Sequence, residues 1–444
     1  MKKAWVFLLS MGLVIVFSAQ VLASMTVKFS GEYYAAGLYL DKTTSNKNDM
    51  VGQSKDLSTA FYYQRLRVKT EFVISPGLIL TTRFDAMERA WGASRQAPNA
   101  VIDSGSAGTR AENENIALDW AYVTYKSPIG VFDAGYMNDG PIGTVFGDSS
   151  SPAGRIKYAN TFGPVIFNAK YTKVKEGSRS TTNPTGVADA DNDKYGLDAT
   201  YKWKENLAGL SFYAYRLADA RPTANNKKRY YLLTPFAQGK IGPVALQAEF
   251  NYAWGKENEF DSDTFLADVD MQNISAWIDA VANFGLFYVG GTAAYVSGDD
   301  PGTTDKREGG TLTGGIDWNP CLIMWNYDLT YWVGNINGYN NARQSSPMSN
   351  AWFFQARGGV RPVDRLDIMA SVSYANADKK PTAAWVNNSY GYELDLTATY
   401  RITNNLSYML GGGYLFTGDF YKGESDANAI RDNYLLINKL TLTF

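Results

Sequence analysis

Apolar and polar residues alternate along many short stretches of this chain. From Leu246 to Trp254, every second side chain is apolar, and Gln247, Glu249 and Asn251 lie between them. Successive side chains of a β-strand point to opposite faces, so the alternation predicts strands with one apolar and one polar face. The pattern recurs at residues 64–72, 325–331 and 392–400. A soluble β-sandwich would turn the apolar faces inward, whereas a membrane barrel would turn them toward lipid.

The lengths of the connections separate these two folds, because short turns alternate with longer polar segments. The predicted short turns lie at residues 75–77, 127–130, 162–164, 205–208, 240–243, 283–285, 319–321, 362–364 and 403–405. The longer segments are 41–57, 89–115, 138–152, 175–191, 219–227, 256–270, 297–308, 334–349, 377–387 and 418–430. Outer-membrane barrels separate short periplasmic turns from long outer loops in this way. We therefore predict an all-β protein, a closed antiparallel transmembrane barrel of about 18–20 strands, with about 16 also compatible.

The two ends of the chain predict export and assembly. Lys2 and Lys3 precede an apolar run at residues 4–17, which is shorter than the ~20 residues of a spanning helix. We expect residues 1–23 to be a cleaved signal peptide and residues 24–444 to be the barrel. The last predicted strand ends at Phe444. It resembles the terminal strand of Gram-negative outer-membrane proteins, which the barrel-assembly machinery reads, and this places the protein in the outer membrane.

Composition excludes several kinds of chemistry. The chain has no histidine, which removes Ser-His and Cys-His nucleophiles and His-ligated zinc or haem. Its 42 basic and 44 acidic residues give no reason to expect a nucleic-acid partner. Cys321 is the single cysteine, so an internal disulfide cannot form, and we read it as a bystander at a turn. We predict neither an enzyme nor a cofactor-binding or metal-binding protein.

The connection after the fifth predicted strand carries the most specific motif. Residues 136–148 read YMNDGPIGTVFGD, and they resemble the third loop of Gram-negative general porins, which folds into the barrel. The resemblance implies that residues 138–152 form a pore constriction, with Asp139 and Asp148 as its acidic side chains. Its glycines would permit tight turns. The alternative is an ordinary outer loop with Asp at turn positions.

Basic side chains on the polar faces of early strands suggest an opposing wall. The resemblance to general porins implies that they line the lumen: Arg65, Arg67, Lys69, Arg83, Arg155 and Lys157. Carboxylates occur among them at Glu71, Asp85, Asp119 and Asp133. Because these acids would neutralise part of the positive field, we expect no strong ion selectivity. Alternatively, these basic side chains only keep the inner face of the barrel hydrated.

Two further motifs have simpler interpretations. Residues 189–193 carry a carboxylate at every second position, as calcium loops do, but the glycine and glutamate of an EF-hand are missing. We interpret this segment as a solvated outer loop, with weak divalent-cation bridging to lipopolysaccharide as its conceivable function. Residues 411–413, three glycines within a strand pattern, predict a packing site or a bulge.

These observations lead to a functional prediction with open alternatives. We expect an outer-membrane porin through which small hydrophilic solutes or ions diffuse passively, and the resemblance implies a homotrimer. A substrate-selective barrel like the alginate exporters and a sheath for an electron-transfer haem partner stay open. So do a plugged structural or adhesive barrel and a secreted carbohydrate-active enzyme.

Overall fold

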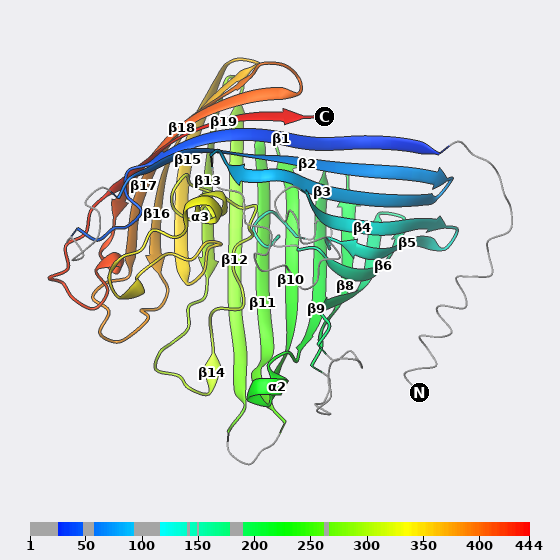
Figure 1. Ribbon diagram of the computed structural model, residues 1–444, viewed down its shortest axis with the longest axis horizontal. Helices are drawn as coiled ribbons and strands as arrows, with labels where there is room; N and C mark the ends of the chain where they lie inside the picture. Colours follow the sequence, from blue (N-terminus) through cyan, green and yellow to red (C-terminus); the bar gives the residue numbers. More distant parts are fainter. Residues whose placement is uncertain are drawn as a thin grey trace.

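The computed structural model describes residues 25–47, 57–92, 116–139, 143–148, 151–177, 190–261 and 266–444. In these residues, 18 long antiparallel strands form a closed barrel, because β1 pairs with both β2 and β19. Figure 1 shows them as a continuous ring. The wall strands are β1 (Thr26–Leu40), β2 (Thr59–Ser75), β3 (Leu78–Ala90), β4 (Ile116–Ser127), β5 (Gly130–Met137), β6 (Ala153–Phe162), β7 (Val165–Lys175), β8 (Asn192–Trp203), β9 (Asn206–Leu217), β10 (Asn226–Ile241), β11 (Val244–Phe260), β12 (Val269–Phe284), β13 (Phe287–Val296), β15 (Ala351–Val363), β16 (Leu366–Ala377), β17 (Ser389–Arg401), β18 (Leu406–Thr417) and β19 (Asn433–Thr443).

A few short elements lie in the connections between these strands. They are α2 (Arg221–Ala224), β14 (Lys306–Arg307), α3 (Tyr327–Val333), η1 (Tyr339–Asn341) and η2 (Asp419–Lys422). β14 pairs in parallel with β12 and is not part of the closed wall. Among the helices of the described ranges, none is long and apolar enough to cross a membrane.

The predicted alternation of faces is confirmed. On β17, Leu394 and Leu396 are exposed on the outside of the barrel, whereas Glu393 and Asp395 between them are buried on the inside. On β11, Phe250 is likewise exposed and Glu249 is buried. Exposed apolar side chains on the outer face suit lipid, and polar groups on the inner face suit water. The prediction of an all-β closed antiparallel barrel is therefore confirmed.

Short and long connections lie at opposite ends of the barrel, as predicted. Seven of the eight short turns contain two residues, and the eighth contains four. The β2–β3 turn is Pro76-Gly77, in which Gly77 has a φ of 83°. Side chains rarely adopt this left-handed backbone conformation, so glycine at the second position lets the strands reverse direction.

One predicted hairpin is wrong, and this reduces the strand number to 18. The predicted turn at residues 319–321 and the strand at residues 325–331 lie within one connection, residues 297–350, between β13 and β15. Part of that segment is the helix α3, whose N-cap Asn326 accepts a hydrogen bond from the Leu329 backbone N at 2.8 Å. Trp325, just before this N-cap, and Leu329, within the helix, are both buried.

Residues 297–350, here called the long inner loop, fill part of the barrel. Its α3 lies within the ring of strands in Figure 1. The ring of Trp332 packs 4.5 Å from that of Tyr63 on β2, and Trp318 packs 5.5 Å from Phe353 on β15. The largest cluster of buried apolar side chains among the described residues therefore includes both wall and loop side chains.

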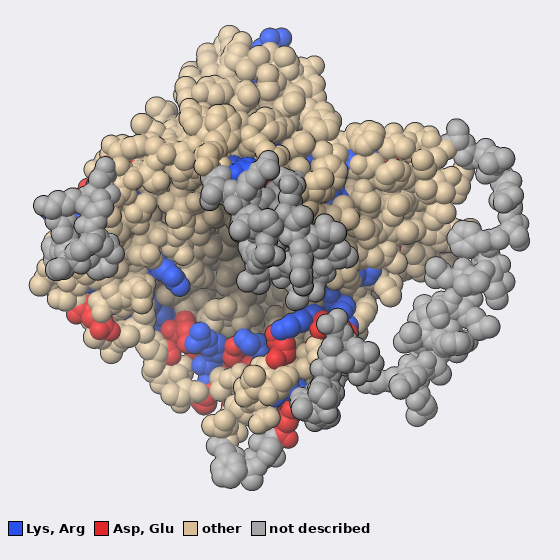
Figure 2. All heavy atoms as spheres, in the orientation of Figure 1, with Lys and Arg blue, Asp and Glu red and all other residues tan. Residues whose placement is uncertain are grey.

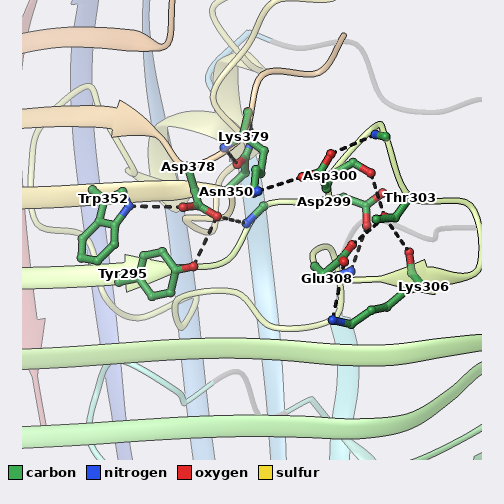
Figure 3. A network of polar contacts seen from close by, with 12 residues as sticks. Tyr295, Asp299, Asp300, Thr303, Lys306, Glu308, Asn350, Trp352, Asp378 and Lys379 are labelled. Carbon is green, nitrogen blue, oxygen red and sulfur yellow. Dashed lines mark hydrogen bonds and ion pairs between the residues drawn. The ribbon is translucent and has the colours of Figure 1, made fainter. Parts of the chain in front are cut away.

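A polar network holds the beginning of the long inner loop. Asp378, after β16, accepts hydrogen bonds from Trp352 Nε1 at 3.3 Å and from the Gly298 backbone N at 2.9 Å (Figure 3). Lys379 Nζ lies 2.9 Å from Asp300 Oδ2, and its hydrogen bond lowers the pKa of Asp300. Both contacts join the beginning of the loop to the β16–β17 connection.

The outward face of β17 gives a test of the membrane orientation. Leu396→Arg would place a charge on the lipid face, where such a change costs about 2–4 kcal/mol near the bilayer midplane. We expect that loss in the free energy of unfolding from lipid bilayers, measured by urea titration. Thr399→Arg, on the inner face of the same strand, is the control and should lose far less. Equal losses would contradict the assignment of faces.

Candidate channel lumen

The predicted bases on β2 and β3 project into the lumen, where each forms an ion pair. Arg67 makes two hydrogen bonds of 2.6 Å to Asp85, and Arg83 Nε lies 3.0 and 3.1 Å from the two oxygens of Asp119. Antiparallel register explains the first pair, because Arg67 and Asp85 lie directly opposite each other on β2 and β3.

The remaining pairs on this wall form either along one strand or across two neighbouring strands. Lys69 Nζ lies 2.6 Å from Glu71. Lys157 on β6 lies 3.8 Å from Asp133 on β5. The four carboxylates named from the sequence thus stand beside the predicted bases, and together they form a wall of mixed charge. Figure 2 shows basic and acidic side chains side by side along the lower edge of the central hollow.

Arg65 has two acidic neighbours that the sequence did not single out. Its guanidinium nitrogens lie 3.6 Å from Glu32 on β1 and 3.6 Å from Glu88 on β3. The opposite positions of Glu32 and Arg67 across β1 and β2 bring these acids to the same wall. Glu32 lies at a polar position of the alternating β1 pattern. Glu88 is out of step with Arg83 and Asp85, and a register shift between β2 and β3 turns it inward.

Asp139 forms the most buried pair of the predicted site. Its carboxylate contacts the Arg155 side chain on β6, and Lys194 Nζ on β8 lies 2.6 Å from it. Burial would raise the pKa of Asp139, but the charges of Lys194 and Arg155 more than offset this and hold the pKa below its usual value. Asp139 is thus bound directly to the basic wall rather than facing it across an opening.

Lys194 was missed from the sequence, as was the pair Lys170 and Asp198, whose charged atoms lie 2.8 Å apart on β7 and β8. Both bases occupy inward positions of strands that are continuous with the predicted ladder. The ladder therefore extends from β2 to β8 and is longer than the early-strand set suggested.

Residues 143–148 of the connection between β5 and β6, here called the short inner loop, cross to the β10–β12 wall. The Thr144 backbone N and Oγ1 donate to Glu249 Oε2 on β11, at 2.5 and 2.8 Å. Phe146 is fully buried, and its ring stacks parallel to Trp277 on β12 at 5.9 Å. A Cβ atom at Gly147 would overlap the Glu249 carboxyl group, so a larger residue there would require that side chain to move.

The two inner loops touch each other. The Gly315 backbone N of the long inner loop donates to the Phe146 carbonyl, and Trp318 packs edge-on against Phe146 at 5.1 Å. A Cβ atom at Gly315 would lie 2.4 Å from the Asp148 carbonyl. Two loops therefore meet inside the barrel, whereas the sequence suggested only the first.

Polar cavities lie on either side of these loops. A cavity of about 280 Å³ between the short inner loop and the wall is lined by Asp139, Asp148, Arg155, Lys194 and Glu249, among others. Another, of about 580 Å³, lies among the outer connections and is lined by Arg343, Asn350 and Trp385, among others. Asp148 thus borders the first cavity, on the wall side of the short inner loop.

This arrangement was compared with known proteins. OccK2 (OpdF) of Pseudomonas aeruginosa, solved in complex with glucuronate, superimposes with a TM-score of 0.50 over 94% of this chain and 98% of its own, at 12% identity. The chain has a porin fold. OpdK of the same organism, solved with vanillate, gives 0.49 over 94% and 99% at 13% identity. The anion-selective porin from Comamonas acidovorans gives 0.45 over 95% and 100% at 10% identity.

No protein-family model matches the chain, and no curated protein sequence matches it. At these identities, the superposition with OccK2 shows the barrel fold alone. The solutes that pass through the lumen depend on the side chains of this chain.

The buried cluster at the base of the short inner loop gives a stability prediction. Asp139→Ala leaves Arg155 and Lys194 without their shared carboxylate, and loss of one partner of a buried pair costs about 3–5 kcal/mol. We expect that decrease in the free energy of unfolding at neutral pH. The exposed pair Lys175–Asp219 is the control, and Asp219→Ala should cost no more than about 1 kcal/mol.

The pKa of Asp139 also fixes the sign of its pH dependence. Because the folded protein lowers the pKa from 3.8, ionised Asp139 contributes fully above that value. Its contribution is lost as the pH falls through the lower pKa of the folded protein. The stability difference between the wild type and Asp139→Asn should therefore disappear in strong acid. A difference that is constant with pH would contradict the ion-pair assignment.

Proposed function

We propose that the protein is an outer-membrane porin that lets small hydrophilic solutes and ions diffuse passively through a water-filled barrel. The observation that carries the proposal is the division of the 18-stranded wall into an apolar outer and a charged inner face. Barrels of 16–18 strands are wide enough to hold an aqueous channel. The likeness to OccK2 supports the same architecture.

The lumen performs no covalent step in this proposal, and diffusion follows the solute gradient. A wall that carries both charges can form hydrogen bonds with a polar solute. These bonds replace the water molecules that the solute loses, so its entry costs little free energy. Because Arg67 and Arg83 are each paired with an aspartate, the field of the wall is partly cancelled. Weak ion selectivity is the expected consequence.

The two inner loops together set the size limit. We assign the role of acidic constriction residues to Asp139 and Asp148, and that of basic lumen residues to the set predicted from the sequence. Lys170 and Lys194 extend that set. The contacts of residues 143–148 with the β10–β12 wall support this assignment.

The remaining parts of the proposal rest on the resemblance to porins. Residues 1–23, which lie outside the described residues, would be removed as a signal peptide. The barrel-assembly machinery would recognise the strand that ends at Phe444, whose side chain faces outward. Lipopolysaccharide would surround the outer rim, and three copies would form the homotrimer.

The contribution of each loop can be measured by liposome swelling with sugars and sugar acids of graded size, glucuronate included. A variant with residues 298–349 replaced by a short Gly/Ser linker should admit larger solutes, because the long inner loop fills part of the lumen. Replacement of residues 138–152 should raise the limit less, because fewer side chains are removed. Replacement of residues 219–225, the connection between β9 and β10, is the control.

A size limit that neither inner-loop replacement changes would contradict the constriction. Absence of any swelling by the wild type, with the barrel correctly inserted, would contradict the porin proposal itself.

The paired charges predict a selectivity cycle. Arg67→Gln leaves Asp85 uncompensated and should favour cations, whereas Asp85→Asn should favour anions. A unit charge about 8 Å from a permeating ion in water contributes about 0.5 kcal/mol, with opposite sign for K⁺ and Cl⁻, or roughly a sixfold change in their permeability ratio. The reversal potential across planar bilayers in a low-salt KCl gradient measures this ratio. The double variant is the control and should return to the wild-type value.

If the reversal potential shifts in the same direction in Arg67→Gln and in Asp85→Asn, the two side chains do not act on the same part of the channel.

A further inference from the structure

A cluster of three metal-ligating side chains lies where the long inner loop meets β17. Cys321 comes from the loop, and Glu393 and Asp395 come from the inner face of the strand. All three are buried, and one ligand atom from each lies within 4.8 Å of the other two. This cluster takes no part in the charged wall described above, and its position does not depend on the proposed function.

The charge of this cluster is not balanced by a basic side chain. Glu393 is 0% and Asp395 is 6% exposed, and neither forms an ion pair with Lys or Arg within the described part of the chain. Other buried carboxylates differ, since Asp198 is paired with Lys170 and Asp139 with Lys194. Two neighbouring buried carboxylates are unfavourable unless a cation or a shared proton compensates them.

The hydrogen bonds leave one ligand position open. Glu393 accepts the Ile323 and Met324 backbone N atoms at 2.6 Å each. Asp395 Oδ2 receives a long contact of 3.4 Å from Ser371 Oγ, and the Leu322 backbone and the Glu393 carboxyl group also lie beside this side chain. Its Oδ1 is buried and has no hydrogen-bond partner among the described residues. A buried carboxylate oxygen without a donor is unfavourable unless a cation or a shared proton compensates it.

The space at the cluster suits an ion rather than an organic molecule. On the neighbouring strand β18, a Cβ atom at Gly413 would lie 2.7 Å from Asp395 Oδ1 and 3.3 Å from Glu393 Oε1. Glycine there leaves room for the two carboxylates, as expected for a packing site, but for little else. Ser373 Oγ, 3.2 Å from Cys321 Sγ, offers a further oxygen at the same point.

We propose that Cys321, Glu393 and Asp395 bind one divalent transition-metal ion of the zinc type, which fastens the long inner loop to the barrel wall. A thiolate together with carboxylates is a ligand set that zinc accepts, whereas calcium and magnesium take oxygen ligands. Binding displaces the thiol proton to solvent, and the metal then compensates the two carboxylates. The ion joins a loop residue to two strand residues, so it opposes withdrawal of the loop from the lumen.

Metal analysis of the whole protein, folded in detergent, tests this site directly. The protein is stripped with a chelator, incubated with Zn²⁺ and freed of excess ion by gel filtration. We expect about one zinc per chain by mass spectrometry. Cobalt in place of zinc should give a thiolate-to-cobalt charge-transfer band, because Cys321 is the single cysteine.

Two variants and one control test which side chains bind the metal ion. Cys321→Ser should abolish the cobalt band, and Asp395→Asn should lower zinc affinity about tenfold or more. Asp364→Asn, at an exposed turn between β15 and β16, should retain the wild-type stoichiometry. These measurements need no transport assay, so failure of the porin proposal would leave their outcome unaffected.

Substoichiometric zinc in the folded wild type would overturn the proposal, as would zinc retained unchanged in both variants. A shared proton is the competing explanation. It predicts no bound zinc, together with an unchanged or increased free energy of unfolding in Asp395→Asn. If Asp395→Asn does not fold, the zinc stoichiometry of the wild type and the cobalt spectrum of Cys321→Ser still distinguish a bound metal ion from a shared proton.

Discussion

Closure of the backbone hydrogen-bond ladder is the constraint on which the rest of this structure depends. A bilayer interior offers no water to unpaired N–H and C=O groups, so a membrane sheet must have no free edge. The pairing of β1 with β19 supplies that closure, and the Gly31 and Phe444 backbones bond to each other at its end. Once the wall is closed, each side chain of an alternating strand faces either the lipid or the lumen.

The lumen is then organised by inward carboxylates, which the protein uses in two ways. Asp85, Asp119 and Asp139 compensate bases on the wall. Glu249 and Glu393 instead accept backbone N–H groups, from the short and the long inner loop respectively. A carboxyl group can accept several N–H groups at once, so a single wall residue can hold a crossing loop in place.

These two uses of carboxyl groups explain how a wide barrel can keep a polar lumen while the inner loops fill part of it. The charged part of the wall from β2 to β8 stays polar, whereas aromatic side chains of the inner loops, such as Phe146, Trp318 and Trp325, join the buried apolar cluster with other wall residues. The apolar part supplies packing that fixes the loops, and the paired charges border the remaining space. The proposed metal ion would add a third kind of attachment on β17.

The sequence by itself determined the local features: the strands, their two faces, the segregation of short turns from long loops, and the basic ladder on early strands. These follow from alternation and from turn residues such as Gly77, which act within a few positions. It could not decide whether residues 325–331 form a strand or a helix, because their pattern over seven positions fits both. Only the tertiary structure placed that segment inside the barrel, joined Asp139 to Lys194 across 55 positions, and brought Cys321 to Asp395. Such contacts depend on the register and curvature of the closed sheet, which no local pattern contains.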